Sequence, residues 1–148
     1  MTQAVPYQVA DLIVAQLTTI TTSAAFSDVL VLRADSLERI PRNVPRALIV
    51  IPGGIRVDDQ TRNQAAIAEE LIVVVAARNA STPLTGEASQ TDAGALLGAV
   101  VAALLGWIPG EPWSPLVMTS SPAPNHESGY GYYPLAFETT YVLTGVSL

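Results

Sequence analysis

The chain has 148 residues, of which 49% are hydrophobic and only 14% are charged, and its formal net charge at pH 7 is −6. It contains no cysteine, which excludes disulfides, thiolate metal sites and cysteine nucleophiles. The negative net charge argues against nucleic acid as a main partner, because phosphate binding needs clustered lysine and arginine. A chain of this length buries enough surface to fold unaided, so we expect one domain over residues 1–148.

The charged residues are unevenly distributed along the chain. All seven basic residues are arginines between Arg33 and Arg78, and residues 79–148 contain five acidic residues and no basic one. Arginine without lysine suits ion pairs at subunit interfaces, and codon bias in a GC-rich genome explains it equally well. The charged fraction lies below the roughly 25% of typical domains, which predicts a surface of neutral polar side chains or one buried against other subunits.

The first third of the chain predicts a helix followed by two strands. Apolar residues recur at helical spacing over residues 6–22, and Pro6 suits a first turn. The start of the chain lacks the basic and apolar regions of a signal peptide, so none is expected. Residues 27–34 alternate as a short strand, and residues 46–51, which are apolar on both faces, predict a central strand.

A long hairpin is predicted next. Pro52-Gly53-Gly54 predicts a turn that ends the second strand, and residues 67–77 predict a third strand rich in β-branched side chains. We therefore expect a protruding hairpin loop around residues 52–64, which is longer than usual for a hairpin. The paired carboxylates Asp58-Asp59 and Glu69-Glu70 are interpreted as solvated surface, and in a strand the second pair would point to opposite faces.

A second helix is predicted over residues 92–105, with Ser89 or Thr91 as its cap. No charged residue lies between Asp92 and Glu111. The apolar run spans about 24 Å as a helix, less than the ~30 Å core of a bilayer, and its flanks lack basic residues, so no membrane span is expected. Leucine and valine fill one half of the helix, which should pack on the sheet. Glycine and alanine fill the other half, which predicts close packing against the first helix or against a neighbouring subunit.

The last part of the chain predicts two more strands, at residues 114–121 and 131–146. Pro134 predicts an edge or a bulge in the longer one. Six residues of that strand alternate onto one face: Tyr133, Leu135, Phe137, Thr139, Tyr141 and Leu143. Strands outnumber helices without regular βαβ alternation, which predicts an α+β fold with a mostly antiparallel sheet and two main helices packed on one face.

No residue pattern indicates catalysis, a cofactor or a metal. His126 is the sole histidine and lies beside Glu127 and Ser128. Adjacent residues in a loop do not form a catalytic triad, and one histidine without cysteines falls short of a zinc site. Trp107 and Trp113, with their neighbouring prolines, predict a hydrophobic lid over the helix end, and a protein-binding patch is the alternative.

Taken in order, these segments resemble the tail terminator (tail completion) proteins of long-tailed bacteriophages. The resemblance depends on an amphipathic first helix followed by four segments: "VPRALIVIPGG" (44–54), "AEELIVVVAARN" (68–79), "LLGWIPGEPWSPL" (104–116) and "GYYPLAFETTYVL" (131–143). The order of these segments spans nearly the whole chain, and the helix corner followed by the aromatic strand is its most specific part.

The resemblance implies a structural virion protein with no catalytic activity, cofactor or metal. Such proteins form a ring, expected to be a hexamer, that caps the tail tube, stops its polymerisation and gives the neck a docking surface. The implied partners are further copies of the chain, the tail tube protein and a head–tail connector or neck protein. The implied location is the head-proximal end of the tail, after assembly in the host cytoplasm.

Candidate interface residues come from the sequence alone, because the resemblance supplies no residue motif to transfer. For contacts with a neighbouring subunit or the tube, we predict the charged residues of the hairpin tip: Arg56, Asp58, Asp59 and Arg62. On the small-residue half of the second helix, we predict Ala95, Ala99 and Ala102.

Two alternatives stay open at this point. The first is another ring protein of the tail or neck, either a tube protein or a head–tail connector. The second is a small-ligand-binding α+β domain with its pocket near Tyr130, Tyr132, Tyr133 and Trp113.

Overall fold

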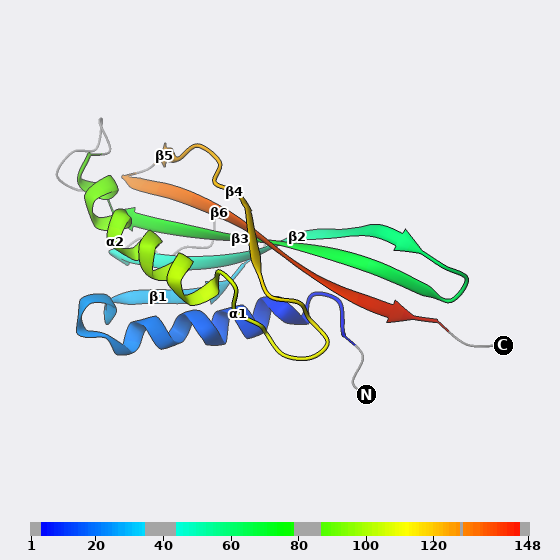
Figure 1. Cartoon of the computed structure of the whole chain (residues 1–148). Coiled ribbons are helices and arrows are strands. Elements are labelled where there is room, and N and C mark those ends of the chain that lie inside the picture. Colours follow the sequence, from blue (N-terminus) through cyan, green and yellow to red (C-terminus); the bar gives the residue numbers. More distant parts are fainter. Residues whose placement is uncertain (1–3, 35–43, 79–86, 128, 146–148) are drawn as a thin grey trace.

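The computed structural model describes residues 4–34, 44–78, 87–127 and 129–145, and for residues 87–92 it describes the backbone alone. In these ranges a twisted sheet is covered on one face by two α-helices (Figure 1). The helices are α1 (Gln8–Thr18) and α2 (Glu87–Leu104), and α1 is followed by the short 3₁₀ helices η1 (Thr19–Thr22) and η2 (Ala24–Phe26). The strands are β1 (Val29–Arg33), β2 (Arg46–Gln60), β3 (Gln64–Arg78), β4 (Val117–Ser120), β5 (Asn125–Glu127) and β6 (Tyr130–Thr144).

The sheet has the strand order β1-β2-β3-β6-β4, and β5 also pairs with β6. The β1–β2 pair is parallel, and the other pairs are antiparallel. The predicted α+β class, with a mostly antiparallel sheet, is confirmed. Strand β3 lies between β2 and β6, and all 15 of its residues pair with β6.

Both helices bury apolar side chains against the same face of the sheet. Ile13 and Leu17 of α1, and Leu96, Val100 and Leu104 of α2, are fully buried in one core with the odd-numbered residues of β3 and β6. The prediction that the leucine-valine half of α2 packs on the sheet is therefore confirmed for these residues. Among the described residues, no helix is both long enough and apolar enough to cross a membrane.

The alternation predicted for the last strand is confirmed. Its six odd-numbered residues from Tyr133 to Leu143 lie on the helix side, buried or packed against the core. Pro134 lies inside β6, and its carbonyl accepts a hydrogen bond from Ser121 Oγ at 3.4 Å on the outer edge. The N and C=O of one strand residue point the same way, so the proline nitrogen also faces outward, and no bond to β3 is lost.

The segment Pro52-Gly53-Gly54 is not a turn, contrary to the prediction. It lies inside β2, which continues to Gln60, and the pairing with β3 shifts register between Pro52 and Gly54. Gly54 has φ 104°, which L side chains rarely adopt, and a Cβ on Gly53 would lie 2.8 Å from Glu70 Oε1. The glycines therefore let the strand bulge and continue, and the turn shrinks to residues 61–63.

Because β2, β3 and β6 continue past the helices, they form a three-stranded arm (Figure 1). We define the arm as Gly53–Gln60 of β2, Gln64–Ala68 of β3 and Thr139–Thr144 of β6. It takes the place of the loop predicted around residues 52–64, since β2 pairs with β3 as far as Gln60 opposite Ala65.

Both helices differ from their predicted bounds, and α1 begins at Gln8, two residues after the predicted start. Helix α1 ends at Thr18 and continues to Thr22 only as 3₁₀ helix, and the hydroxyls of its last threonines bond back to carbonyls one turn earlier. Helix α2 begins at Glu87, so Ser89 and Thr91 lie inside it and do not cap it.

The core predicts a large difference between two neighbouring leucines at the end of α2. Leu104 is fully buried, whereas Leu105 is 54% exposed. Leu104→Ala should lower the free energy of unfolding by about 2–5 kcal/mol, because it leaves a cavity in the core. Leu105→Ala should change it by less than about 0.5 kcal/mol. Urea unfolding of both variants measures the difference, and equal losses would contradict this packing.

Candidate functional site

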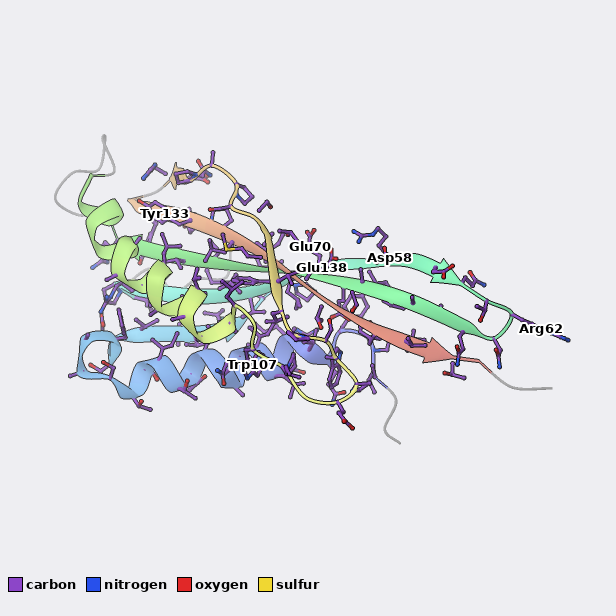
Figure 2. All side chains as sticks on the ribbon, viewed as in Figure 1. Asp58, Arg62, Glu70, Trp107, Tyr133 and Glu138 are labelled. Atoms are coloured by element: carbon purple, nitrogen blue, oxygen red, sulfur yellow. The ribbon has the colours of Figure 1, made fainter. Side chains whose placement is uncertain are left out.

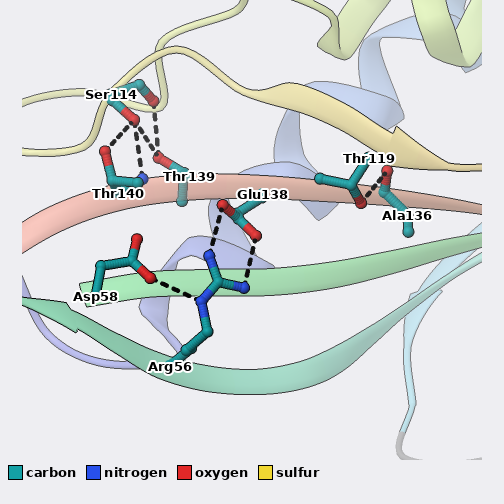
Figure 3. A network of polar contacts seen from close by, with 8 residues as sticks. All are labelled: Arg56, Asp58, Ser114, Thr119, Ala136, Glu138, Thr139 and Thr140. Atoms are coloured by element: carbon teal, nitrogen blue, oxygen red, sulfur yellow. Dashed lines mark hydrogen bonds and ion pairs between the residues drawn. The ribbon is translucent and has the colours of Figure 1, made fainter.

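The charged residues predicted for the hairpin tip all lie exposed on the arm or its turn. Arg56 Nε lies 2.7 Å from Asp58 Oδ1, and its two Nη atoms each lie 3.4 Å from an oxygen of Glu138 on β6 (Figure 3). The pKa of Arg56 is raised by these carboxylates, most by the hydrogen-bonded Asp58. Arg56 therefore links β2 to β6 across β3, and Glu138 is a partner that sequence reasoning missed.

Asp59 and Arg62 lie farther out along the arm. Asp59 Oδ1 accepts a hydrogen bond from the Gln60 backbone N–H at 2.8 Å. Arg62 lies in the turn at the tip and points away from the rest of the molecule (Figure 2). It forms no ion pair with any residue in the described part of the chain. The structure thus brings Arg56 and Asp58 together and leaves the Arg62 charge at the far end of the arm.

The arm also exposes apolar side chains and an unpaired strand edge. Ile55 and Val57 of β2 are 41% and 54% exposed, and Val142 of β6 is 48% exposed. Strand β1 pairs with Arg46–Val50 of β2, and within the described residues no strand pairs with the outer edge of β2 beyond Val50. Unpaired backbone groups beside apolar side chains can receive another strand.

A buried carboxylate lies at the base of the arm. Glu69 is fully buried on the helix side, whereas Glu70 is half-buried on the opposite face. The prediction of opposite faces is confirmed, and the prediction of solvated surface is wrong for Glu69. Its Oε1 accepts hydrogen bonds from the Tyr141 hydroxyl at 2.7 Å and from the Tyr7 backbone N–H at 3.2 Å. Burial first, and then the bond to Glu69, raise the pKa of Tyr141 well above its usual value.

The corner after α2 is fastened to β6 beside this carboxylate. Thr139 Oγ1 donates to the Ser114 carbonyl at 2.7 Å, and the Thr140 backbone N–H donates to Ser114 Oγ at 2.8 Å (Figure 3). Trp113 is buried, and its ring meets that of Tyr141 edge-on with centroids 6.5 Å apart. Trp113 therefore packs at the base of the arm as part of the core.

Much of the small-residue half of α2 is left uncovered by the described part of this chain. Ala95 and Ala102 are exposed, and Ala99 is half-buried. A Cβ built on Gly94 or on Gly98 would meet no other atom within 4 Å. Helix α1 reaches only the margin of this half, where Gln16 Nε2 donates to the carbonyl of the half-buried Ala103 at 3.2 Å. The first helix therefore does not explain the glycines, and packing against a neighbouring subunit remains the prediction.

The residues of the alternative ligand pocket are separated by the sheet. Tyr133 and Trp113 belong to the core on the helix side, whereas Tyr130 and Tyr132 pack with the cluster on the opposite face. His126 is exposed, and its Nε2 lies 3.2 Å from the Tyr133 hydroxyl. In the described ranges, no group of three or more His, Asp or Glu side chains is placed to hold a metal.

Comparison with known proteins gives a family match and a likeness of fold. A family model for "Phage tail terminator protein" matches residues 9–147. A chain of the solved structure "Virion of native gene transfer agent (GTA) particle" superposes with a TM-score of 0.58 and 18% sequence identity, covering 93% of this chain and 99% of that one. At this identity the likeness establishes the fold. The search of curated proteins gave no match.

The Tyr141–Glu69 contact predicts a loss of stability at alkaline pH. Because the folded protein raises the pKa of Tyr141 above its usual value of 10.0, the unfolded chain releases this proton first as the pH rises. The stabilisation that the Tyr141 hydroxyl gives the folded protein is fully present below pH 10. It is lost as the pH rises through the higher pKa of the folded protein. In Tyr141→Phe, the free energy of unfolding should fall less steeply above about pH 10 than in the unmodified chain. Urea unfolding over an alkaline pH series tests this, and parallel curves would contradict it.

Proposed function

The chain belongs to the phage tail terminator family, and from this premise we propose that it forms a closed ring, a hexamer, that caps the tail tube. In this proposal the ring stops tube polymerisation and presents its other face to the head–tail connector or neck protein. The ring then lies at the head-proximal end of the tail and assembles in the host cytoplasm. The role is structural and not enzymatic, and it requires no cofactor or metal.

The observation that carries this proposal is the family match over residues 9–147, nearly the whole chain. The geometry supports it through two unlike surfaces left uncovered in the described residues, the arm and the small-residue half of α2. A ring of identical subunits needs two different patches on each subunit, because one patch of every copy meets the other patch of the next.

We propose these two surfaces as contacts within the ring or with the tube. On the arm, Asp59 and Arg62 carry charges that are not paired across the strands, whereas Arg56 and Asp58 hold each other. On α2, the small side chains of two exposed alanines and one half-buried alanine allow the backbone of another subunit to approach closely. The proposed contact residues of the helix are Ala95, Ala99 and Ala102.

A first experiment separates this proposal from the other ring proteins of a tail. Purified protein should form closed rings in electron micrographs, and native mass spectrometry should give one species of six copies. Long tubes would indicate a tube protein instead, because such a protein must stack on itself without limit. A strict monomer, both alone and when mixed with tail tube, would contradict the ring.

A second experiment tests the proposed contact residues by adding charge. Arg62→Glu and Ala102→Arg should each weaken assembly by about tenfold or more, since one reverses the charge at the tip and the other places a long cation on a close-packed surface. Sedimentation at low and high salt measures this, and the Arg62 effect should shrink with salt. The control is Ala24→Glu, which adds charge at an exposed position of η2, outside the arm and outside α2. Equal behaviour of all three variants would contradict the assignment.

A further inference from the structure

We propose that the free outer edge of β2 in the arm pairs with strand β4 of a second copy, so that the sheet continues from one subunit into the next. This inference rests on the proposed ring and names the backbone contact between its subunits. It assigns a role to two exposed strand edges that neither the family match nor the charged residues explain.

The receiving edge is the part of β2 between its two irregularities. Register with β3 shifts between Pro52 and Gly54 and again between Val57 and Asp59, which leaves Gly54–Val57 as a regular stretch of strand. Ile55 lies opposite Glu69 and Val57 lies opposite Ile67, both residues of the helix side. Residues directly opposite each other share a face, so Ile55 and Val57 also lie on the helix side, where both are exposed.

The donated strand is β4, which lies at the opposite side of the sheet. Its four residues, Val117–Ser120, are all exposed, and they carry no charge. Val117 is 53% exposed and Met118 is 41% exposed. Its inner edge pairs with β6, and no described strand pairs with its outer edge. Pro115 and Pro122 flank β4 and limit pairing beyond its ends, whereas Val117–Ser120 themselves contain neither a charged residue nor a proline, so another strand can pair along this stretch.

The two edges fit each other in chain direction. The regular stretch of β2 has four residues, and β4 also has four, with an irregularity in its pairing with β6 between Met118 and Ser120. Strands β2 and β6 are both antiparallel to β3, so they run in the same direction, and β4 runs opposite to both. When ring neighbours are related by a rotation about an axis near the strand direction, corresponding strands run in the same direction in both copies. Strand β4 of the second copy therefore meets β2 as an antiparallel partner.

The same geometry selects β4 over the other exposed edge strand. Strand β1 lies on the β2 side of the sheet, so a β1–β2 contact between copies would join two equivalent sides. A head-to-tail contact joins opposite sides, which lets every copy donate one edge and receive one, and such a contact closes into a ring.

Engineered cysteines test this contact cleanly, because the chain contains none of its own. Met118 lies opposite Phe137 of the helix-side core, so it shares the face of Ile55 and Val57. Opposite residues of neighbouring antiparallel strands lie close enough for a disulfide. Full-length Met118→Cys mixed with Ile55→Cys, or with Val57→Cys, should shift under mild oxidation from monomer to dimer on a non-reducing gel. All three positions are exposed, so these variants should fold.

Two controls define the outcome. Met118→Cys with Arg56→Cys tests the wrong face of β2, and Met118→Cys with Leu30→Cys tests the edge strand β1, whose Leu30 is 37% exposed. Neither pair should cross-link above the level of single variants. Rings seen by native mass spectrometry without the Met118 cross-link would overturn this inference and leave the proposed function standing. Persistent monomers without cross-links would overturn both. Cross-linking of Ile55→Cys to itself would show a two-fold β2–β2 contact and would also overturn the inference.

Discussion

The pairing of β3 with β2 on one side and β6 on the other is the constraint on which the rest of the structure depends. Fifteen paired residues make a ladder about 50 Å long, whereas the 18 residues of α2 span only about 27 Å. Helix α1 is shorter still, with 11 residues, so the two helices cannot cover three strands of that length. The uncovered remainder is the arm, and its exposed Ile55 and Val57 follow directly from the mismatch. A virion protein that assembles with other subunits can tolerate such a surface, because assembly removes it from water.

Much of the fold could be predicted from local patterns along the chain. The alternation from Tyr133 to Leu143 fixed one face of β6, and the leucine-valine half of α2 fixed the surface that packs on the sheet. The bulge in β2 could not be predicted in this way. Pro-Gly-Gly is the usual signal of a turn, and only pairing with β3 on the far side of the hairpin shows that the strand survives it. The start of α2 was missed for a similar reason, since Ser89 and Thr91 favour caps locally and yet are held inside a helix.

The proposed contact surfaces and the buried carboxylate were only partly visible in the sequence. The charges of the arm could be named, because polar residues between two apolar strands must be exposed. The burial of Glu69 could not, because its hydrogen bonds come from Tyr7 and Tyr141, which lie 62 and 72 residues away in the chain. A carboxyl beside a second carboxyl looks like surface until such distant donors are known. The alternation of the strand was the one available signal, since it places Glu69 on the same face as Leu71 and Val73.

Hydrogen bonds hold the arm at its base, where β6 meets the corner after α2 and the buried Glu69. Ser114 holds β6 from the side of the corner, and the Tyr7 backbone and the Tyr141 hydroxyl meet on Glu69 from within. The ion pair from Arg56 to Glu138 joins β2 to β6 at the base of the arm. Ladder hydrogen bonds join the three strands along the arm, and the bonds of Ser114 join β6 to the corner that follows α2, so a partner bound at the tip is connected to the helix layer through this one strand.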